Sequence, residues 1–458
     1  MQIEGKTVLV AGTGVSGLAA ARLLNENNIK TILYDSNANK SKREVYASFD
    51  EIGDMQLVFG ELDDEILDSI SLAVLSPGIP LEQPFVQKIK NRNIPVWGEI
   101  ELAYYFEKGT VIGITGTNGK TTTTTLVGEI MKAYCEKVFV VGNIGLPYTS
   151  QADKTDQNSI TVAEISSFQL ETICDYRPHI SAILNITPDH LNRHHTFENY
   201  CRAKFDITKN QGEDDVCVLN YDNDETRMFG EDIMHTDVLF FSRKVSLENG
   251  ICLGADHDTI VYRTSNSSQG IVKVSSLKLM GKHNVENVMA AIGIAISMNV
   301  PVEVIRKVVC AFTAVEHRIE YVTEKNNVKY YNDSKGTNPD AAIKAIEAMV
   351  RPTVLIAGGY DKKSEYDEWI AACTGKVKAL ILIGATAKAI EAAARRYDIE
   401  DVTIVETLED AVVLASKKAA PKDAVLLSPA CASWDMFTSY EERGKLFKEY
   451  VHKLPDMV

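Results

Sequence analysis

Short apolar runs alternate with amphipathic segments along most of the chain, and this alternation predicts β-strands separated by α-helices. The first apolar runs lie at residues 6–11 and 31–35 and in the segment 72–80, which ends in a Pro-Gly turn. Similar runs open the later segments 111–125, 138–147, 159–171, 181–207, 216–224, 353–359, 379–384, 402–406 and 424–437. Residues 236–280 contain many short β-like runs and turns, which predict an antiparallel patch, and a helix begins at 281–296. The pattern predicts an α/β fold with mostly parallel sheets.

The chain of 458 residues is long enough for about three domains. We predict a Rossmann-like domain at 1–97, a central P-loop ATPase-like domain with a parallel sheet at 98–314, and a second Rossmann-like domain at 315–458. We place the first boundary after residue 97 because the phosphate-binding pattern at 116–121 belongs to a new strand–loop–helix unit. The third domain lacks a G-x-G-x-x-G loop, so we do not expect it to hold a dinucleotide.

The segment 111–125 has the pattern of a loop that binds a polyphosphate. An apolar strand leads into a glycine-containing turn at 116–119, and Lys120 with a run of threonines opens a helix. Glycines let backbone N–H groups approach phosphates, the lysine reaches the terminal phosphates, and the Thr121 hydroxyl can coordinate Mg²⁺. The match is imperfect because the usual pattern requires its first glycine at position 114, where this chain has Ile114, and Gly113 is one place too early. The plainer alternative is a strand–turn–helix with a surface lysine.

A second glycine loop stands near the start of the chain. Residues 12–17 read G-T-G-V-S-G between a strand and a helix, and Asp35 ends the next strand. A G-x-G-x-x-G loop followed by an acid about 20 residues later is the fingerprint of dinucleotide-binding domains. This domain is short for two mononucleotide-binding halves, so we predict that it holds one nucleotide and not NAD. A tight strand–helix turn without a ligand is the alternative.

Composition narrows the class of protein. The formal net charge is −15, which argues against non-specific binding to nucleic acid or to anionic membranes. The eight cysteines include no C-x-x-C pair and are predicted to be reduced thiols. The chain begins directly with a strand pattern, and no apolar run approaches the ~18 residues of a membrane span. We therefore expect a cytoplasmic protein.

Polar residues follow several predicted strands of the central domain, at the edge where parallel sheets bind ligands. Asn143, Glu164 and His190 occupy such positions. The Thr121 hydroxyl and the Glu164 carboxylate supply oxygen ligands of the kind that Mg²⁺ prefers. The sequence therefore predicts a magnesium site beside the phosphate loop.

Three histidines, His190, His194 and His195, superficially suggest zinc. No cysteine nearby completes a structural zinc site, and the Pro-Asp step at 188–189 favours a loop over the continuous helix that the spacing would need. We therefore expect His194 and His195 to be solvated loop residues. Lys204, on the following helix, would ordinarily be solvated as well.

The motifs of the chain occur in an order that resembles one known family. They read TGTNGKTTT, VGNIG, AEISSFQLE, TPDHLNRH, GKHNVENVMAA, VEHRIE, NDSKGTNP and LLSPACASWDMF. Each motif is weak alone, but the ordered set covers essentially the whole chain and resembles the Mur ligases of peptidoglycan synthesis. In this family the first glycine loop cradles the UDP of a sugar-nucleotide substrate.

The resemblance implies an ATP-dependent ligase that adds D-glutamate to UDP-N-acetylmuramoyl-L-alanine. ATP would phosphorylate the substrate carboxylate, and the amine of D-glutamate would then displace phosphate. A carboxylate is already nucleophilic, so positioning and charge neutralisation would be the main tasks of the protein. We expect small-molecule partners only, no nucleic acid, no membrane insertion and a monomer. Sister ligases that add another amino acid, a folylpolyglutamate synthetase and a non-catalytic nucleotide-dependent module remain the alternatives.

The resemblance also implies the residues of each subsite. ATP would contact Gly116, Thr117, Asn118, Gly119, Lys120, Thr121, Thr122, Asn284, Asn287, Arg318 and Asp333. The UDP-bearing donor would contact Gly14, Val15, Ser16, Asp35, Ser36, Gly78 and Asn143. D-Glutamate would contact Lys335, Thr337, Lys363, Ser433 and Phe437, with Lys362 as the alternative to its neighbour.

The family's chemistry assigns catalytic roles to Lys120, His190 and Lys204. One Mg²⁺ would be held by Thr121 and Glu164, and a second by His190 and Lys204. Lys204 would be carried as its carbamate, which turns a cation into an anionic oxygen ligand.

Overall fold

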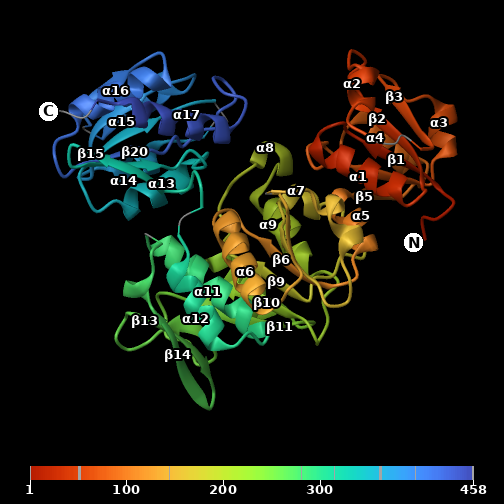
Figure 1. Cartoon of the computed structure of the whole chain (residues 1–458), viewed down its shortest axis with the longest axis horizontal. Coiled ribbons are helices and arrows are strands. Elements are labelled where there is room, and N and C mark those ends of the chain that lie inside the picture. Colours follow the sequence, from red (N-terminus) through yellow and green to blue (C-terminus); the bar gives the residue numbers. More distant parts are fainter. Residues whose placement is uncertain are drawn as a thin grey trace. The chain divides into compact units, whose positions relative to one another are not determined.

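The computed structural model of the chain describes residues 2–49, 53–143, 145–279, 281–313, 315–360, 364–397 and 399–455. It divides into two compact units (Figure 1). The first contains Met1–Ser275 and Glu286–Cys310, and the second contains Ser276–Val285 and Ala311–Val458. Among the described residues, no helix combines the length and the apolar composition needed to cross a bilayer. Each unit is described by itself below.

The first unit begins with a parallel sheet of strand order β3-β2-β1-β4-β5, here called the N-terminal sheet. Its strands are β1 (Thr7–Ala11), β2 (Lys30–Asp35), β3 (Met55–Phe59), β4 (Leu72–Leu75) and β5 (Val96–Gly98). Its helices are α1 (Val15–Glu26), α2 (Lys42–Tyr46), α3 (Asp64–Ser69), α4 (Pro84–Asn91) and α5 (Glu99–Phe106). The predicted strands and the glycine turn before α1 are confirmed. Strands β3 and β5 were not predicted, because β3 is a partly exposed edge strand and β5 has only three residues.

The same unit contains a nine-stranded central sheet of order β14-β13-β12-β11-β10-β9-β6-β8-β7. Its strands are β6 (Thr110–Thr115), β7 (Val138–Gly142), β8 (Ile160–Glu164), β9 (Ile180–Ile183), β10 (Val216–Asn220), β11 (Asp237–Ser242), β12 (Gly250–Leu253), β13 (Thr259–Thr264) and β14 (Ser267–Lys273). Strands β6 to β12 pair in parallel, and β12, β13 and β14 pair antiparallel. The antiparallel patch predicted at 236–280 is confirmed for β12 to β14, whereas β11 pairs in parallel with both of its neighbours.

Helices connect the strands of the central sheet. They are α6 (Lys120–Tyr134), α7 (Ser167–Leu170), α8 (Leu191–His194), α9 (Phe197–Phe205), α10 (Asp224–Asp232), α11 (Lys282–Ser297) and α12 (Val302–Ala311). Short 3-10 turns are η1 (Tyr148–Ser150), η2 (Ala152–Lys154), η3 (Asp206–Thr208) and η4 (Val274–Ser276). Strand β6 lies between β8 and β9. The strands β7 and β8 that follow it are on one side of it in the sheet, and β9 and β10 are on the other side. Such a switch in strand order opens a crevice at the carboxyl ends of the strands, which is where the phosphate loop follows β6.

Helix α5 joins the N-terminal sheet to the central sheet through buried carboxylates. Glu99 accepts hydrogen bonds from the backbone N and the hydroxyl of Thr149 at 2.7 and 2.8 Å. Glu101 accepts from the backbone N of all three residues at 174–176, at 2.7 to 3.1 Å. Buried carboxylates are stable only when donors surround them, so these contacts fix the two sheets of the first unit against each other.

The second unit contains a six-stranded C-terminal sheet of order β15-β16-β20-β17-β18-β19. Its strands are β15 (Glu320–Lys325), β16 (Val328–Asn332), β17 (Thr353–Ala357), β18 (Val377–Leu382), β19 (Val402–Ile404) and β20 (Ala424–Leu427). Its helices are α13 (Pro339–Ala348), α14 (Asp367–Cys373), α15 (Ala387–Arg396), α16 (Leu408–Lys418) and α17 (Tyr440–Lys453). The four predicted strands are confirmed and pair in parallel, and the hairpin of β15 and β16 is an addition that the apolar pattern did not predict.

Candidate active site

The phosphate loop connects β6 to α6 in a conformation that requires glycine. Gly116 has φ +149° and Gly119 has φ +86°, both in the region that other residues rarely adopt. Gly119 is also the N-cap of α6, and a Cβ added there would collide with the side-chain amide of Asn287. Backbone amides at the start of α6 are thereby turned toward the carboxyl edge of the sheet, as a phosphate site needs.

The loop after β9 holds the phosphate loop in place. Thr117 donates from its backbone N to the carbonyl of Asn185 at 2.9 Å, and its hydroxyl donates to the carbonyl of Thr187 at 3.1 Å. The side-chain amide of Asn185 exchanges two hydrogen bonds with the backbone of Asn118, at 2.8 and 3.0 Å. The loop after β9 therefore supports the conformation of the phosphate loop through both backbone and side-chain contacts.

Two lysines meet at one carbonyl of the phosphate loop. Lys120 donates from Nζ to the carbonyls of Gly116 at 2.7 Å and Thr117 at 2.9 Å. Lys204 donates from Nζ to the same Gly116 carbonyl at 2.8 Å. Lys204 is 1% exposed, and burial, followed by repulsion from Lys120, lowers its pKa well below the usual lysine value. Lys204 is thus a buried amine that readily loses its proton, and not a solvated helix lysine.

Glu164 ends β8 with one carboxylate oxygen satisfied and one not. Its Oε1 accepts from the side-chain amide of Asn143 at 2.9 Å, and Asn143 N donates to the Glu164 carbonyl at 2.8 Å. Its Oε2 is buried and has no hydrogen-bond partner among the described residues. Glu164 pairs in register with Ile114 of β6, and Thr121 is buried in the first turn of the helix after that strand. A buried carboxylate oxygen that lacks a donor fits a cation such as Mg²⁺.

The threonines at the start of α6 provide weaker evidence for a ligand site than Glu164 does. The hydroxyl of Thr122, a predicted ATP contact, is buried without a hydrogen-bond partner among the described residues. The hydroxyls of Thr123 and Thr124, deeper in the helix, share this property. The missing partner therefore does not by itself distinguish Thr122 as a ligand-binding residue.

The histidines of α8 have two different environments. His190 is half-buried, has φ +54° as the N-cap of α8, and contacts the Phe168 ring edge-on at 4.9 Å between centroids. His194 is 5% exposed, with Nε2 2.9 Å from the Ser167 hydroxyl and Nδ1 3.4 Å from Glu171. Burial lowers the pKa of His194 to about 4. Our expectation of a solvated His194 was wrong, because α7 covers the loop that the sequence pattern predicted to be open.

Asp35, the acid that follows the first glycine loop, forms hydrogen bonds with residues of its own domain. Asp35 accepts from the Thr13 backbone N at 3.2 Å, from the Thr13 hydroxyl at 2.6 Å and from Lys40 at 2.8 Å. Burial raises the pKa of Asp35, but the hydrogen bonds from Lys40 and Thr13 have a larger opposite effect. The pKa is therefore lowered to about 2. The carboxylate is therefore charged and already paired within the domain.

A hollow beside this loop contains part of the predicted donor site. Gly12, Asp35, Ser36 and Gly78 line it together with side chains of α4 and the loop before it. Val15, at the start of α1, is 74% exposed although it is apolar. The structure thus brings the residues of 12–15, 35–36 and 78 to one edge of the N-terminal sheet, whereas Asn143 lies against Glu164 in the central sheet.

In the second unit, the predicted acceptor residues lie on two neighbouring loops. Lys335 and Thr337 follow β16, while Ser433 and Phe437 follow β20, and these two strands pair in parallel. Their carboxyl ends therefore meet at one edge of the C-terminal sheet. The lysine pair at 362–363 lies outside the described residues.

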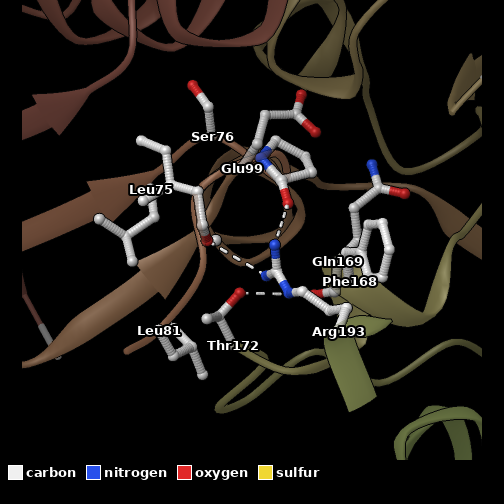
Figure 2. A pocket seen from close by; sticks show the side chains of 11 residues that line it. Leu75, Ser76, Leu81, Glu99, Phe168, Gln169, Thr172 and Arg193 are labelled. Carbon is white, nitrogen blue, oxygen red and sulfur yellow. Dashed lines mark hydrogen bonds between the residues drawn. The ribbon is translucent and has the colours of Figure 1, made fainter. Parts of the chain in front are cut away.

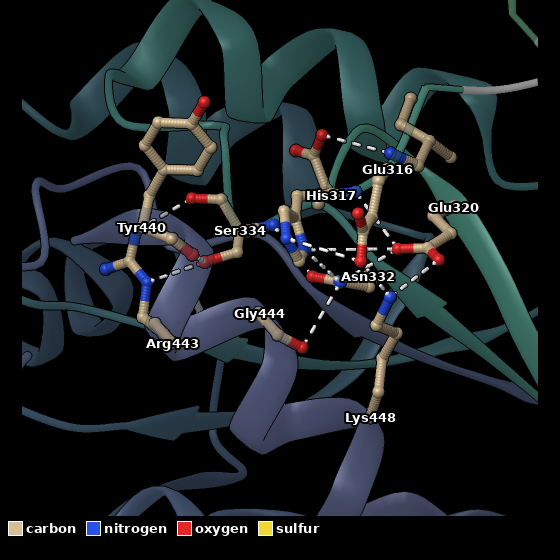
Figure 3. A network of polar contacts seen from close by, with 11 residues as sticks. Glu316, His317, Glu320, Asn332, Ser334, Tyr440, Arg443, Gly444 and Lys448 are labelled. Carbon is tan, nitrogen blue, oxygen red and sulfur yellow. Dashed lines mark hydrogen bonds and ion pairs between the residues drawn. The ribbon is translucent and has the colours of Figure 1, made fainter. Parts of the chain in front are cut away.

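A buried arginine, which the sequence analysis missed, ties these loops together (Figure 3). Arg443 of α17 is 0% exposed and donates to the hydroxyl and the carbonyl of Ser334 at 2.9 and 2.8 Å. It also donates to the carbonyls of Cys431 and Ala432 at 3.2 to 3.3 Å. Burial lowers its pKa to about 10. Its position in the first turn of a helix, where a cation opposes the helix dipole, was the available signal.

Three of the remaining predicted nucleotide contacts, Asn284, Asn287 and Asp333, are also buried, and Arg318 is partly exposed. Asn284 and Asn287 lie three residues apart on α11 and so share one face of that helix. Burial raises the pKa of Asp333 to about 7 against the opposing effect of Arg318, and the Ser428 hydroxyl donates to Asp333 at 2.8 Å. The Nε of Arg318 is buried and has no hydrogen-bond partner among the described residues.

Three family models match successive parts of the chain. The Mur ligase MurD-like N-terminal domain matches residues 6–98, the Mur ligase middle domain matches 114–295, and the Mur ligase glutamate ligase domain matches 317–431. Together they cover most of the chain, in the order that the motifs predicted.

Curated relatives and solved structures agree with these matches. The UDP-N-acetylmuramoylalanine–D-glutamate ligase of Lachnoclostridium phytofermentans is 53% identical over 100% of both chains. That of Lachnospira eligens is 49% identical over 99% of this chain and 100% of the relative. The solved structure of UDP-N-acetylmuramate-alanine ligase MurC from Thermotoga maritima has a TM-score of 0.60 at 17% identity, covering 98% of this chain and 99% of that one. MurF ligase from the same organism, in complex with ADP, has a TM-score of 0.60 at 16% identity, covering 95% and 99%. The chain belongs to the Mur ligase family.

Proposed function

We propose that this protein is an ATP-dependent ligase that joins D-glutamate to UDP-N-acetylmuramoyl-L-alanine in the synthesis of peptidoglycan precursors. The observation that carries the proposal is the identity of 42–53% over essentially the full chain to relatives that bear the name of this ligase. The phosphate loop, with Lys120 and the buried Lys204 at one carbonyl, supports ATP as the second substrate.

The reaction proceeds in two steps. A carboxylate oxygen of the donor attacks the γ-phosphorus of ATP, which forms an acyl phosphate and releases ADP. The amine of D-glutamate then attacks the acyl carbon, loses a proton, and expels phosphate. Lys120 and the amides of the loop neutralise the charge that moves between the phosphates, so the protein accelerates the reaction by positioning and electrostatics.

Two Mg²⁺ positions fit the residues beside the loop. Mg²⁺, when bound, supplies positive charge to the phosphate oxygens of ATP. Thr121 and Glu164 would hold one ion, and the Glu164 oxygen that has no hydrogen-bond partner among the described residues would be one of its ligands. His190 and Lys204 would hold the second, with Lys204 as its carbamate. The lowered pKa of Lys204 supports this modification, because only a neutral amine adds CO₂.

We assign the three domains as predicted, with the donor in the domain at 1–97, ATP in the domain at 98–314, and D-glutamate in the domain at 315–458. Contacts to the donor come from the loop edge of the N-terminal sheet together with Asn143. Contacts to D-glutamate come from the two loops that Arg443 ties together. Arg318 and Asp333, which lie in the second unit, are the further residues that we propose as contacts to ATP.

We further propose a cytoplasmic monomer. Support for the compartment comes from the eight cysteines, all in the described part of the chain, none of which forms a disulfide. Light scattering of the purified protein at micromolar concentration would give a mass near 50.6 kDa for a monomer.

Phosphate release in the presence of UDP-N-acetylmuramoyl-L-alanine, scanned over amino acids, tests the proposed function. We expect release that depends on the donor and on D-glutamate, and a product heavier by one glutamyl residue in mass spectrometry. Release with L-alanine or a diamino acid in place of D-glutamate would identify a sister ligase. Nucleotide binding without turnover would identify a non-catalytic module.

A further inference from the structure

One arginine of the central domain reaches into the N-terminal domain within the first unit (Figure 2). Arg193 of α8 donates from Nη2 to the carbonyl of Ile79 at 3.1 Å and from Nη1 to the carbonyl of Pro77 at 3.5 Å. Its side chain is only 11% exposed. These two carbonyls flank Gly78, so the guanidinium holds the backbone on both sides of a residue assigned to the donor site.

The same guanidinium also packs on an aromatic ring that contacts His190, which we assign to the nucleotide site. Arg193 lies over the ring of Phe168, with Cζ 4.6 Å from the ring centroid, and the same ring contacts His190. Within α8, the backbone N of Arg193 donates to the carbonyl of His190 at 2.9 Å. A displacement of Arg193 would therefore move His190 through both the helix turn and the shared aromatic ring.

A carboxylate fixes the guanidinium between these two sides. Glu171 Oε2 accepts from Arg193 Nη2 at 2.7 Å, and Glu171 Oε1 lies 3.4 Å from His194 Nδ1. The opposite ring nitrogen of His194 lies 2.9 Å from the Ser167 hydroxyl at the start of α7. These contacts lock α8 onto α7, which begins three residues after Glu164. The planar guanidinium donates hydrogen bonds to acceptors on several sides at once. The ammonium group of lysine cannot reproduce this geometry.

We propose that Arg193 is a positioning residue that couples donor binding at the Gly78 loop to binding of the ATP–metal complex at His190. The proposal rests on the proposed function, because it takes the donor loop and the nucleotide site from it. Donor binding fixes the loop at 77–79, the loop carbonyls fix Arg193, and Arg193 fixes His190 in the position that the nucleotide complex requires. Coupling between sites is reciprocal, so bound nucleotide also tightens donor binding.

Calorimetry on the full-length protein measures this coupling directly. The Kd of the Mg²⁺ complex of a non-hydrolysable ATP analogue is determined with and without saturating UDP-N-acetylmuramoyl-L-alanine. In the parent protein we expect the donor to tighten analogue binding about fivefold or more, within the range typical of coupled sites. In Arg193→Met we expect the ratio of the two Kd values to fall to about 1 while both ligands still bind, and in Arg193→Lys we expect an intermediate ratio.

Arg306 provides a matched control. It donates to the carbonyls of Ile271 and Gly270 at 2.6 and 3.2 Å and pairs with Glu303, so it has the same kinds of partners away from the active site. We expect Arg306→Met to retain the coupling ratio of the parent, which separates coupling from a general loss of stability. A parent ratio of about 1, or an unchanged ratio in folded Arg193→Met or Arg193→Lys, would overturn the inference. Failure of the parent to bind the donor at all would contradict the proposed function and this inference with it.

Discussion

The two glycine loops of the first unit share a local structure but differ in what surrounds them. Each follows a parallel strand and opens a helix, β1 into α1 and β6 into α6. Around the second loop lie two lysines and a carboxylate oxygen that has no hydrogen-bond partner in the described part of the chain. Around the first, the carboxylate of Asp35 accepts hydrogen bonds from Thr13, Asn37 and Lys40. The two loops therefore share a strand–turn–helix backbone and differ in the charged groups beside it.

The largest expected effect comes from removing the lysine of the second loop. Lys120→Ala should lower ATP turnover about 1000-fold, because a preorganised donor to the phosphates is lost. Binding of UDP-N-acetylmuramoyl-L-alanine at the first loop should change less than twofold. Lys132→Ala, on the exposed side of the same helix, is the matched control and should retain activity. Near-normal turnover in folded Lys120→Ala would contradict the assignment of the phosphate loop.

Lys204 tests whether the second loop needs an anionic oxygen ligand. Lys204→Ala should lose about 100-fold in turnover, and added acetate should restore part of it by supplying the missing carboxylate. Because the lowered pKa belongs to the free amine, acidification protonates it and should reduce carbamate formation and activity. Lys204→Arg should not support turnover, since a guanidinium cannot form a carbamate. Full activity of that variant would return Lys204 to a structural role.

Glycine substitutions distinguish the loops by conformation. Gly119→Ala forces a Cβ onto a φ of +86° and against Asn287, so we expect about a tenfold rise in the KM for ATP. Gly14 has φ −80° and open space where its Cβ would lie, so Gly14→Ala should leave the melting temperature unchanged. It should nevertheless weaken donor binding about tenfold, because the methyl group occupies the approach of a phosphate. Unchanged donor affinity in Gly14→Ala would place the donor elsewhere.

The smallest expected effect is on stability at the first loop. The folded pKa of Asp35, about 2, is below its ordinary value of 3.8. Its contribution to stability is therefore present above about pH 4 and is lost as pH falls toward 2. Asp35→Asn should lower the free energy of unfolding of the protein by about 1 kcal/mol at pH 7 and by less at pH 3. Equal losses in urea titrations at the two pH values would show that hydrogen bonding, and not charge, accounts for the contribution.

Local patterns in the sequence were sufficient to predict both loops. Strand, glycine turn and helix follow one another within a short segment, so apolar periodicity and glycine spacing identify them without knowledge of the fold. The alternation of strands and helices likewise predicted the parallel sheets. The edge strands β3 and β5 and the hairpin of β15 and β16 were not predicted, because short or partly exposed strands give a weaker apolar pattern than buried central strands.

Residues that act through distant partners could not be predicted in this way. Arg443 bonds Ser334, which lies 109 positions earlier, and Arg193 bonds backbone carbonyls 114 and 116 positions earlier. His194 looked solvated in the sequence because its covering helix, α7, is separated from it by strand β9. Such contacts depend on the order of strands in the sheet, which apolar periodicity does not reveal.

Transfer of an isotope label tests the central claim most directly. The protein is incubated with ATP, D-glutamate and UDP-N-acetylmuramoyl-L-alanine whose terminal carboxylate carries ¹⁸O, and the released phosphate is analysed by mass spectrometry. An acyl phosphate formed at the second loop predicts one donor ¹⁸O atom in each phosphate, because the attacking oxygen leaves with phosphorus. Phosphate that carries no ¹⁸O, released in amounts equal to the peptide product, would contradict the account.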